Sequence, residues 1–143
     1  MPIYESKGFG NDLNLFDKKA PFDYVAERRP MKVPQGENID DFKRNSAPYC
    51  IAGKVKQDEN GNYKRNNASL VYRDLIFLDY DELEASIDFP SVVDNALHGY
   101  SYIIYPTIKH TKEKPRYRLV VKPSDGMTEQ TYRQTVQEIA SKI

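Results

Sequence analysis

The sequence predicts an α+β domain in which helices cover an antiparallel or mixed sheet. Strand-like apolar runs separated by turn residues, a short helix between two of these runs, and an amphipathic final segment support this fold class. The chain has 143 residues, of which 39% are hydrophobic and 29% are charged. Such a chain is long enough for one domain with one sizeable core.

The first third of the chain is weakly patterned. Prolines interrupt residues 1–48 and exclude a long helix, because proline lacks a backbone N–H. Residues 40–45 are expected to add only a short helical turn. We therefore predict an irregular N-terminal arm over residues 1–48 and the catalytic or binding core over residues 49–143.

Strand signals begin after this arm. Residues 51–56 are predicted as a strand, and the Asn60-Gly61 turn is expected to bring residues 63–66 back antiparallel, because both residue types tolerate positive φ. Residues 69–80 are predicted as one long strand, rich in β-branched and aromatic residues. Apolar side chains fall on both of its faces, so we expect this strand to be covered on both sides.

The second half of the chain alternates helix and strand signals. Pro90 is favoured in the first turn of a helix, and Gly99 is suited to end that helix. Residues 100–108 and 116–122 are predicted as two strands joined by a polar loop. Thr128 is a good N-cap for a final helix, which has one apolar face.

Bulk composition excludes several classes of protein. No apolar run is long enough to span a membrane, and the N-terminus lacks the pattern of a signal peptide. The single cysteine, Cys50, excludes an intramolecular disulfide and a cysteine-based zinc site. We therefore expect a cytoplasmic protein with a reduced thiol and no membrane contact.

The formal net charge is zero, but the charges are not evenly distributed. Residues 79–94 contain six acids and no Lys or Arg, whereas residues 109–122 contain six basic residues and one acid. Blocks of opposite charge are typical of solvated faces, and they are also able to hold metal ions beside phosphates.

Two aspartates end the apolar run LIFLDYDE at residues 75–82. Residues i and i+2 of a strand point to the same face, so Asp79 and Asp81 are expected side by side, roughly 6.5–7 Å apart along the strand. Carboxylates this close suit Mg²⁺ or Mn²⁺, because hard cations prefer oxygen ligands. The alternative is an acidic turn that merely ends the strand.

A histidine and two arginines follow in YPTIKHTKEKPRYRLVV. His110 lies where the strand enters the loop, and Arg116 and Arg118 share one face of the return strand. Guanidinium groups bind phosphate through two hydrogen bonds at once, and His110 offers another donor. Lys112 and Lys114 on the loop are further candidates for contacts with a triphosphate or a nucleic-acid template.

These residues resemble motifs of the archaeo-eukaryotic primase superfamily, in particular the primase–polymerase domains at the N-termini of phage and plasmid replication proteins. Asp79-Tyr80-Asp81 is similar to the first motif, an apolar run that ends in acid-x-acid. Residues 108–110 are similar to the second motif, although Ile108 stands where the family has a small residue. Arg65 and the turn before it look like the hairpin that precedes the first motif.

The resemblance implies an RRM-like sheet with flanking helices, present here as an incomplete primase–polymerase core. It implies that Asp79 and Asp81 are catalytic and bind Mg²⁺ or Mn²⁺, and that His110 is catalytic and contacts the phosphates of the incoming nucleotide. Arg116 and Arg118, with Lys112 and Arg65, are the other expected nucleotide contacts.

The implied partners are nucleoside triphosphates, a single-stranded DNA template and a helicase domain in the same polypeptide. The family's third metal-binding acid follows the final helix, so it is expected beyond residue 143, and enzymatic activity is expected of the full-length protein. Two other functions remain open: a metal-dependent nuclease or phosphodiesterase, and a non-enzymatic module that binds single-stranded nucleic acid.

Overall fold

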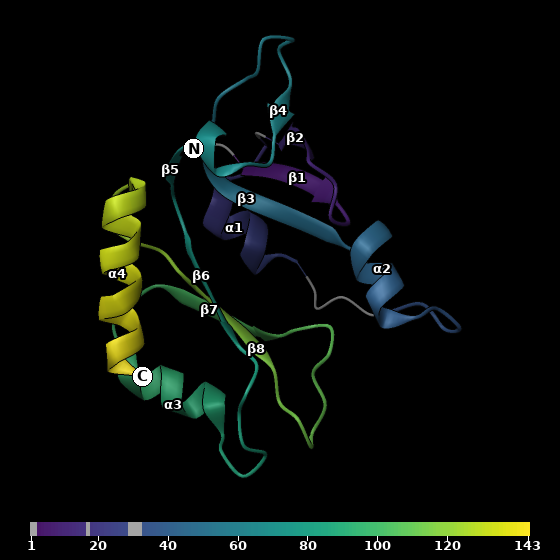
Figure 1. The fold of residues 1–143 in the computed structure, drawn as a ribbon. Helices are drawn as coiled ribbons and strands as arrows, with labels where there is room; N and C mark the ends of the chain where they lie inside the picture. Colours follow the sequence, from purple (N-terminus) through teal and green to yellow (C-terminus); the bar gives the residue numbers. More distant parts are fainter. Residues whose placement is uncertain (1–2, 17, 29–32) are drawn as a thin grey trace.

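The described part of the chain forms two antiparallel sheets in the computed structural model, which covers residues 3–16, 18–28 and 33–143 (Figure 1). The first sheet has the strand order β4-β2-β1-β3-β5 and the second has the order β6-β8-β7. The α+β fold class is thus confirmed, with two sheets in place of one. The strands of the first sheet are β1 (Ile3–Lys7), β2 (Asp12–Phe16), β3 (Pro48–Val55), β4 (Tyr63–Lys64) and β5 (Leu70–Arg73). The second sheet contains β6 (Ile76–Tyr80), β7 (Tyr102–Pro106) and β8 (Tyr117–Val121).

The prediction of an irregular N-terminal arm is wrong. Strand β1 lies inside the first sheet, paired with β2 on one side and with β3 on the other. Ile3 and Tyr4 are buried although β1 also carries polar residues, because pairing with β3 places them in the core. This pairing joins residues more than 40 positions apart in the sequence, and local periodicity carries no signal for it.

The turn between β1 and β2 packs closely against the helix that contains Arg44. Gly8 has a φ of 63°, and a Cβ at this position would lie 2.1 Å from the carbonyl oxygen of Arg44. The Phe9 N–H donates to the same carbonyl at 2.8 Å. Only glycine fits this close approach, which attaches the first sheet to α2 (Ile39–Asn45), a helix that the sequence predicts correctly.

Residues 69–80 do not form one strand. The chain leaves the first sheet after β5 and enters the second sheet at β6. At the break, the Asp74 N–H donates to the Ala52 carbonyl at 3.0 Å, and Arg73 exchanges two backbone hydrogen bonds with Met127. The chain bends at Asp74 and Leu75 but is extended on both sides of the bend, so alternation in the sequence does not reveal the change of sheet.

Strand β4 also differs from the prediction. Its two residues pair with β2, and a single bridge between Gln57 and Tyr63 connects it to the end of β3. The predicted turn is confirmed: Gly61 has a φ of 78°, and the Asp58 carboxylate accepts hydrogen bonds from two backbone N–H groups of the turn.

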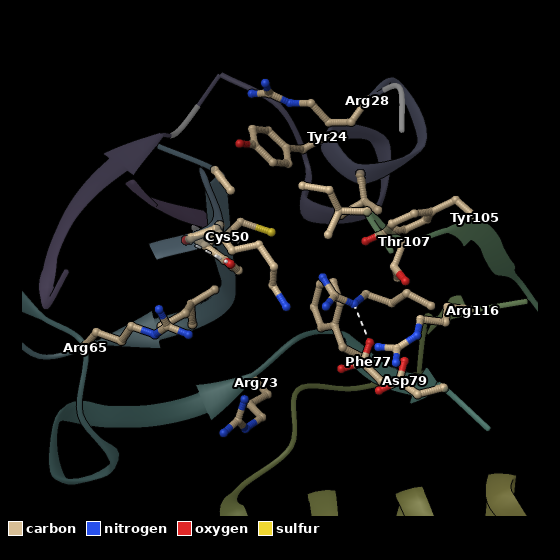
Figure 2. A pocket seen from close by; sticks show the side chains of 18 of the residues that line it. Tyr24, Arg28, Cys50, Arg65, Arg73, Phe77, Asp79, Tyr105, Thr107 and Arg116 are labelled. Carbon is tan, nitrogen blue, oxygen red and sulfur yellow. Dashed lines mark hydrogen bonds and ion pairs between the residues drawn. The ribbon is translucent and has the colours of Figure 1, made fainter. Parts of the chain in front are cut away.

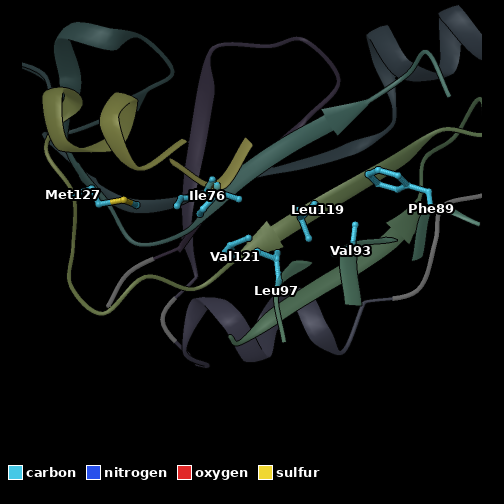
Figure 3. Close-up of a cluster of buried hydrophobic side chains, with 8 residues drawn as sticks. Ile76, Phe89, Val93, Leu97, Leu119, Val121 and Met127 are labelled. Atoms are coloured by element: carbon cyan, nitrogen blue, oxygen red, sulfur yellow. The ribbon is translucent and has the colours of Figure 1, made fainter. Parts of the chain in front are cut away.

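The second sheet is covered on both faces, as the sequence predicts. On one face, Ile76 and Leu119 pack against α3 (Phe89–Ala96) and α4 (Glu129–Lys142) (Figure 3). On the other face, Val120 packs against Ile3 of the first sheet and against α1 (Pro21–Ala26). Burial of each such side chain stabilises the fold by about 1.5–3 kcal/mol, and the shared core holds the sheets together.

The ends of the helices follow the sequence signals. The Thr128 side chain accepts a hydrogen bond from the Thr131 N–H and caps α4. Pro90 lies in the first turn of α3, and Gly99 follows that helix with a φ of 87°. Within the described residues, every helix is too short or too polar to cross a lipid bilayer.

Candidate nucleotide and metal site

The register of the second sheet places a carboxylate directly opposite a guanidinium. Asp79 of β6 pairs with Arg118 of β8, and Arg118 in turn lies opposite Tyr105 of β7. The Arg118 Nε–H donates to Asp79 Oδ1 at 2.7 Å. These three polar side chains therefore stand in a row across one face of the sheet.

This face forms one wall of a cavity of about 930 Å³ between the two sheets. The volume is near the upper end of the range of about 300–1,000 Å³ that is typical of small-molecule pockets. Figure 2 shows Asp79, Tyr105 and Arg116 on one side of the cavity, with Arg65 and Cys50 across from them. The two sheets thus contribute opposite walls to one site.

The cavity is strongly basic. Two acids line it, Asp79 and Asp81, together with a much larger set of basic side chains. The basic residues are Arg28, Lys43, Lys64, Arg65, Arg73, Lys109, Arg116 and Arg118. A concave surface with this balance attracts phosphate groups, because low-dielectric walls concentrate the field of their charges.

Half of these basic residues already have an acidic partner. Arg28 pairs with Glu5, Lys64 with Asp12, Lys109 with Asp40 and Arg118 with Asp79. Among the described residues, no ion pair involves the other four, which are Lys43, Arg65, Arg73 and Arg116. Three of those four lie on the wall formed by α2 and the first sheet.

The structure brings the predicted aspartates to the same cavity. Asp79 is the last residue but one of β6, with its side chain 53% exposed, and Asp81 directly follows the strand in an exposed position. The described hydrogen bonds and ion pairs occupy only one of their four carboxylate oxygens. The described residues contain no group of three or more His, Cys, Asp or Glu side chains arranged for a metal ion.

The carboxylate pair therefore suits a metal that takes only part of its ligands from protein. Mg²⁺ is bound in this way, through one or two carboxylates with waters and substrate phosphates filling the other positions. A site made entirely of protein ligands, as for structural zinc, does not fit these residues.

Arg118 is held firmly in its cationic form. Burial acts to lower the pKa of Arg118, but the hydrogen bond with Asp79 and neighbouring charges outweigh it, so this pKa is above the ordinary value for arginine. Burial also raises the pKa of Tyr105, and its hydroxyl therefore stays protonated beside the guanidinium. The row across the sheet thus contains one anion, one cation and one neutral hydroxyl.

His110 does not line the cavity. Its Nδ1 accepts a hydrogen bond from the Arg116 N–H at 3.0 Å, and its ring meets the edge of Tyr117 at 5.0 Å between centroids. The histidine thus supports the backbone that carries Arg116. Its direct contact with phosphate stays a prediction.

The other predicted basic residues divide into two groups. Arg65 lines the cavity, where its guanidinium lies 5.5 Å from the centre of the Tyr49 ring. Lys112 and Lys114 are exposed on the loop between β7 and β8, outside the cavity. Their contacts with triphosphate or template stay predictions.

A comparison with protein-family models places residues 50–143 in one family, the VapE N-terminal domain. The match covers about two thirds of the chain. The chain belongs to the VapE N-terminal domain family. This is the N-terminal domain of VapE-like replication proteins of phages and plasmids, and it is related to the primase family. No curated protein and no solved structure matched the chain.

The VapE-family match includes β6, β7 and β8 completely, and with them both aspartates and both arginines. Strands β1 and β2 and helices α1 and α2 lie before the matched residues. These preceding segments nevertheless contribute Arg28 and Lys43 to the cavity. The candidate site thus extends beyond the part of the chain that the family model describes.

Sequence reasoning missed several cavity residues, including Lys43, Tyr49 and Arg73. They lie in α2, at the start of β3 and at the end of β5, and no motif connects them. Burial raises the pKa of Tyr49, which keeps its hydroxyl neutral beside Arg65. Only the folding of the first sheet over the second brings these residues to the site.

Proposed function

We propose that the chain is the primase or primase–polymerase domain of a phage or mobile-element replication protein, which performs template-directed, metal-dependent nucleotidyl transfer. One observation carries the proposal: a pair of carboxylates stands in an otherwise basic cavity of about 930 Å³. The carboxylates suit a divalent cation, and the basic residues suit the phosphates that such a cation accompanies. Membership of a replication-protein family supports the same function.

In this proposal Asp79 and Asp81 hold Mg²⁺ or Mn²⁺ at the edge of the second sheet. When bound, such ions stabilise the charge on the attacking and leaving oxygens of a phosphoryl group. The rigid β6–β8 pairing fixes the Asp79 backbone, which reduces the cost of ordering the site when substrate binds.

Arg116 and Arg118 bind the triphosphate of the incoming nucleotide. They lie two positions apart, Arg116 directly before β8 and Arg118 within it, and both line the same cavity as the aspartates. Their planar guanidinium groups match phosphate oxygens in pairs. His110 keeps Arg116 in place through the hydrogen bond to its backbone N–H.

The opposite wall binds single-stranded DNA. Lys43, Arg65 and Arg73 provide positive charge there, and Tyr49 offers an aromatic ring. Basic grooves with aromatic side chains bind single strands through phosphate contacts and base stacking. Because one wall binds the metal and the triphosphate and the other binds DNA, the two walls have different charges. A helicase domain in the same polypeptide would supply the unwound template.

The proposal is tested by measuring how Mn²⁺ and a labelled nucleoside triphosphate bind to the 143-residue chain. Asp79→Asn should abolish Mn²⁺-dependent triphosphate binding, because it removes one of the two anionic metal ligands. Glu84→Gln is the matched control, since Glu84 is exposed in the same acidic block but does not line the cavity. Equal binding by the wild type and Asp79→Asn would reject the proposal.

A reaction assay separates the proposed function from the alternatives. The full-length replication protein that contains this domain is incubated with a single-stranded DNA template, Mn²⁺ and labelled triphosphates. New oligonucleotides support the primase function, whereas shortened DNA identifies a nuclease. DNA binding that EDTA leaves unchanged, together with no triphosphate binding, would identify a non-enzymatic binding module.

A further inference from the structure

Arg118 has two roles that compete with each other. It lies in the cavity as a phosphate ligand in the function proposed above, yet its Nε–H donates to Asp79 Oδ1 at 2.7 Å. Asp79 is also one of the two carboxylates that would hold a cation. A guanidinium and a divalent cation compete for the same carboxylate, because both need its negative charge and its lone pairs.

The ion pair is built into the register of the sheet. Asp79 and Arg118 are direct cross-strand partners, so the β6–β8 pairing presents one to the other. The Arg118 side chain is only 30% exposed, whereas that of Asp79 is 53% exposed. The guanidinium is thus the less hydrated member, and it would pay a desolvation cost if it lost its carboxylate with no other anion to replace it.

Arg116 provides an internal contrast. It lies two positions before Arg118, directly ahead of β8, and lines the same cavity, but no acidic side chain of the described residues pairs with it. A phosphate is thus able to bind Arg116 without displacing anything. At Arg118 a phosphate has to compete with the Asp79 carboxylate for the charge of the guanidinium.

We propose that Arg118 is an exchangeable counter-ion, which neutralises Asp79 when the cavity lacks ligands and turns to phosphate when Asp79 ligates a cation. The proposal rests on the proposed function and adds a coupling between its two ligands. Release of Arg118 makes the guanidinium available to phosphate, and capture of Arg118 by phosphate makes Asp79 available to the cation. Each ligand therefore raises the affinity for the other by the same factor, because binding free energies are linked reciprocally.

The first arm of the test measures Mn²⁺ binding without nucleotide, by the loss of the electron paramagnetic resonance signal of free Mn²⁺. Arg118→Gln should raise the Mn²⁺ affinity by about threefold, since it removes the competing cation of a partly exposed ion pair. Arg116→Gln removes the same charge from the same cavity but breaks no ion pair of the described residues. It should therefore raise the affinity by a clearly smaller factor.

The second arm measures the binding of inorganic tripolyphosphate by calorimetry in the presence of EDTA, so that no metal contributes. Asp79→Asn should raise the anion affinity by about threefold, because it frees Arg118. Asp81→Asn removes the same charge at a residue that pairs with no basic side chain of the described residues, and should raise the affinity less. Circular dichroism confirms that all four variants are folded.

The outcomes separate the coupling from the proposed function. The exchange is supported if Arg118→Gln raises the Mn²⁺ affinity more than Arg116→Gln does. It also requires that Asp79→Asn raise the tripolyphosphate affinity more than Asp81→Asn does. If the wild type binds Mn²⁺ and tripolyphosphate but either pair of variants behaves alike, the exchange is overturned and the proposed function stands. If the wild type binds neither ligand, both are overturned.

Discussion

The two sheets contribute opposite chemistry to one cavity. The second sheet contributes both aspartates and pairs one of them with its own arginine. The first sheet and α2 contribute Lys43, Arg65 and Arg73, which have no acidic partner among the described residues. A site for a polyanion and a cation is therefore formed by two walls. The wall from the second sheet contains acidic and basic side chains together, and the wall from the first sheet and α2 has an excess of basic ones.

The largest expected effect tests whether the first sheet belongs to the core at all. Ile3→Ala should lower the free energy of unfolding by about 2–5 kcal/mol, because Ile3 is fully buried between β3 and the second sheet. Leu15→Ala, at a 44% exposed position of β2, should change it by about 0.5 kcal/mol or less. Urea denaturation measures both, and an equally small effect at Ile3 would mean that residues 3–7 are the irregular arm that the sequence suggests.

The reactivity of Cys50 on β3 tests whether the cavity wall formed by the first sheet is buried. Burial raises the pKa of Cys50 to about 11. At pH 8 the native thiol should therefore be alkylated by iodoacetamide on the order of a hundredfold more slowly than the thiol of the urea-unfolded chain. The native rate should increase about tenfold per pH unit toward pH 11. A native rate that equals the unfolded rate at pH 8 would show that this wall is open to solvent.

The basic charge of the first wall predicts a specific loss of DNA binding. Replacing Lys43 and Arg65 together by alanine should weaken single-stranded DNA binding by about tenfold at low salt. It should also reduce the slope of log K against log salt by about 1.4, because two phosphate contacts are lost. Fluorescence anisotropy of a labelled oligonucleotide measures both quantities. Arg133→Ala with Lys142→Ala, on exposed positions of α4, is the control and should leave the slope unchanged.

The smallest effect concerns α4, which packs on the core of the second sheet and also contacts β5 of the first sheet. Thr128→Ala should destabilise the chain by about 1 kcal/mol, since it removes the N-cap that accepts from the Thr131 N–H. Thr135→Ala lies inside the same helix, where alanine is the better helix former, and should have no destabilising effect. Thermal unfolding of both variants measures the direction of each change in stability. Equal changes would show that the cap contributes nothing.

The sequence predicts the second sheet better than the first for a physical reason. Strands β7 and β8 are short runs of mostly apolar and aromatic residues, and they pair as a hairpin across one connecting loop. Strand β1 carries Glu5, Ser6 and Lys7, and its place in the core comes from pairing with distant β3. The change of sheet at Asp74 is also invisible, because it leaves the backbone extended on both sides.

The candidate site divides in the same way. Acid-x-acid spacing and arginines at i and i+2 are local patterns, and they identify Asp79, Asp81, Arg116 and Arg118, all of which line the cavity. The pairing of Arg118 with Asp79 depends on the β6–β8 register and has no signature in the sequence. Lys43 and the other basic residues of the first wall become neighbours of the acids only through the fold of two sheets.

The central claim is that Asp79 and Asp81 hold a divalent cation in a cavity whose basic residues bind phosphate. Crystals of the chain grown with Mn²⁺ and a non-hydrolysable nucleoside triphosphate test it most directly, through the anomalous scattering of manganese. We predict an anomalous peak within about 2.5 Å of a carboxylate oxygen of each aspartate, with triphosphate oxygens in contact with Arg116. A triphosphate bound in the cavity with no manganese at the aspartates would contradict the account.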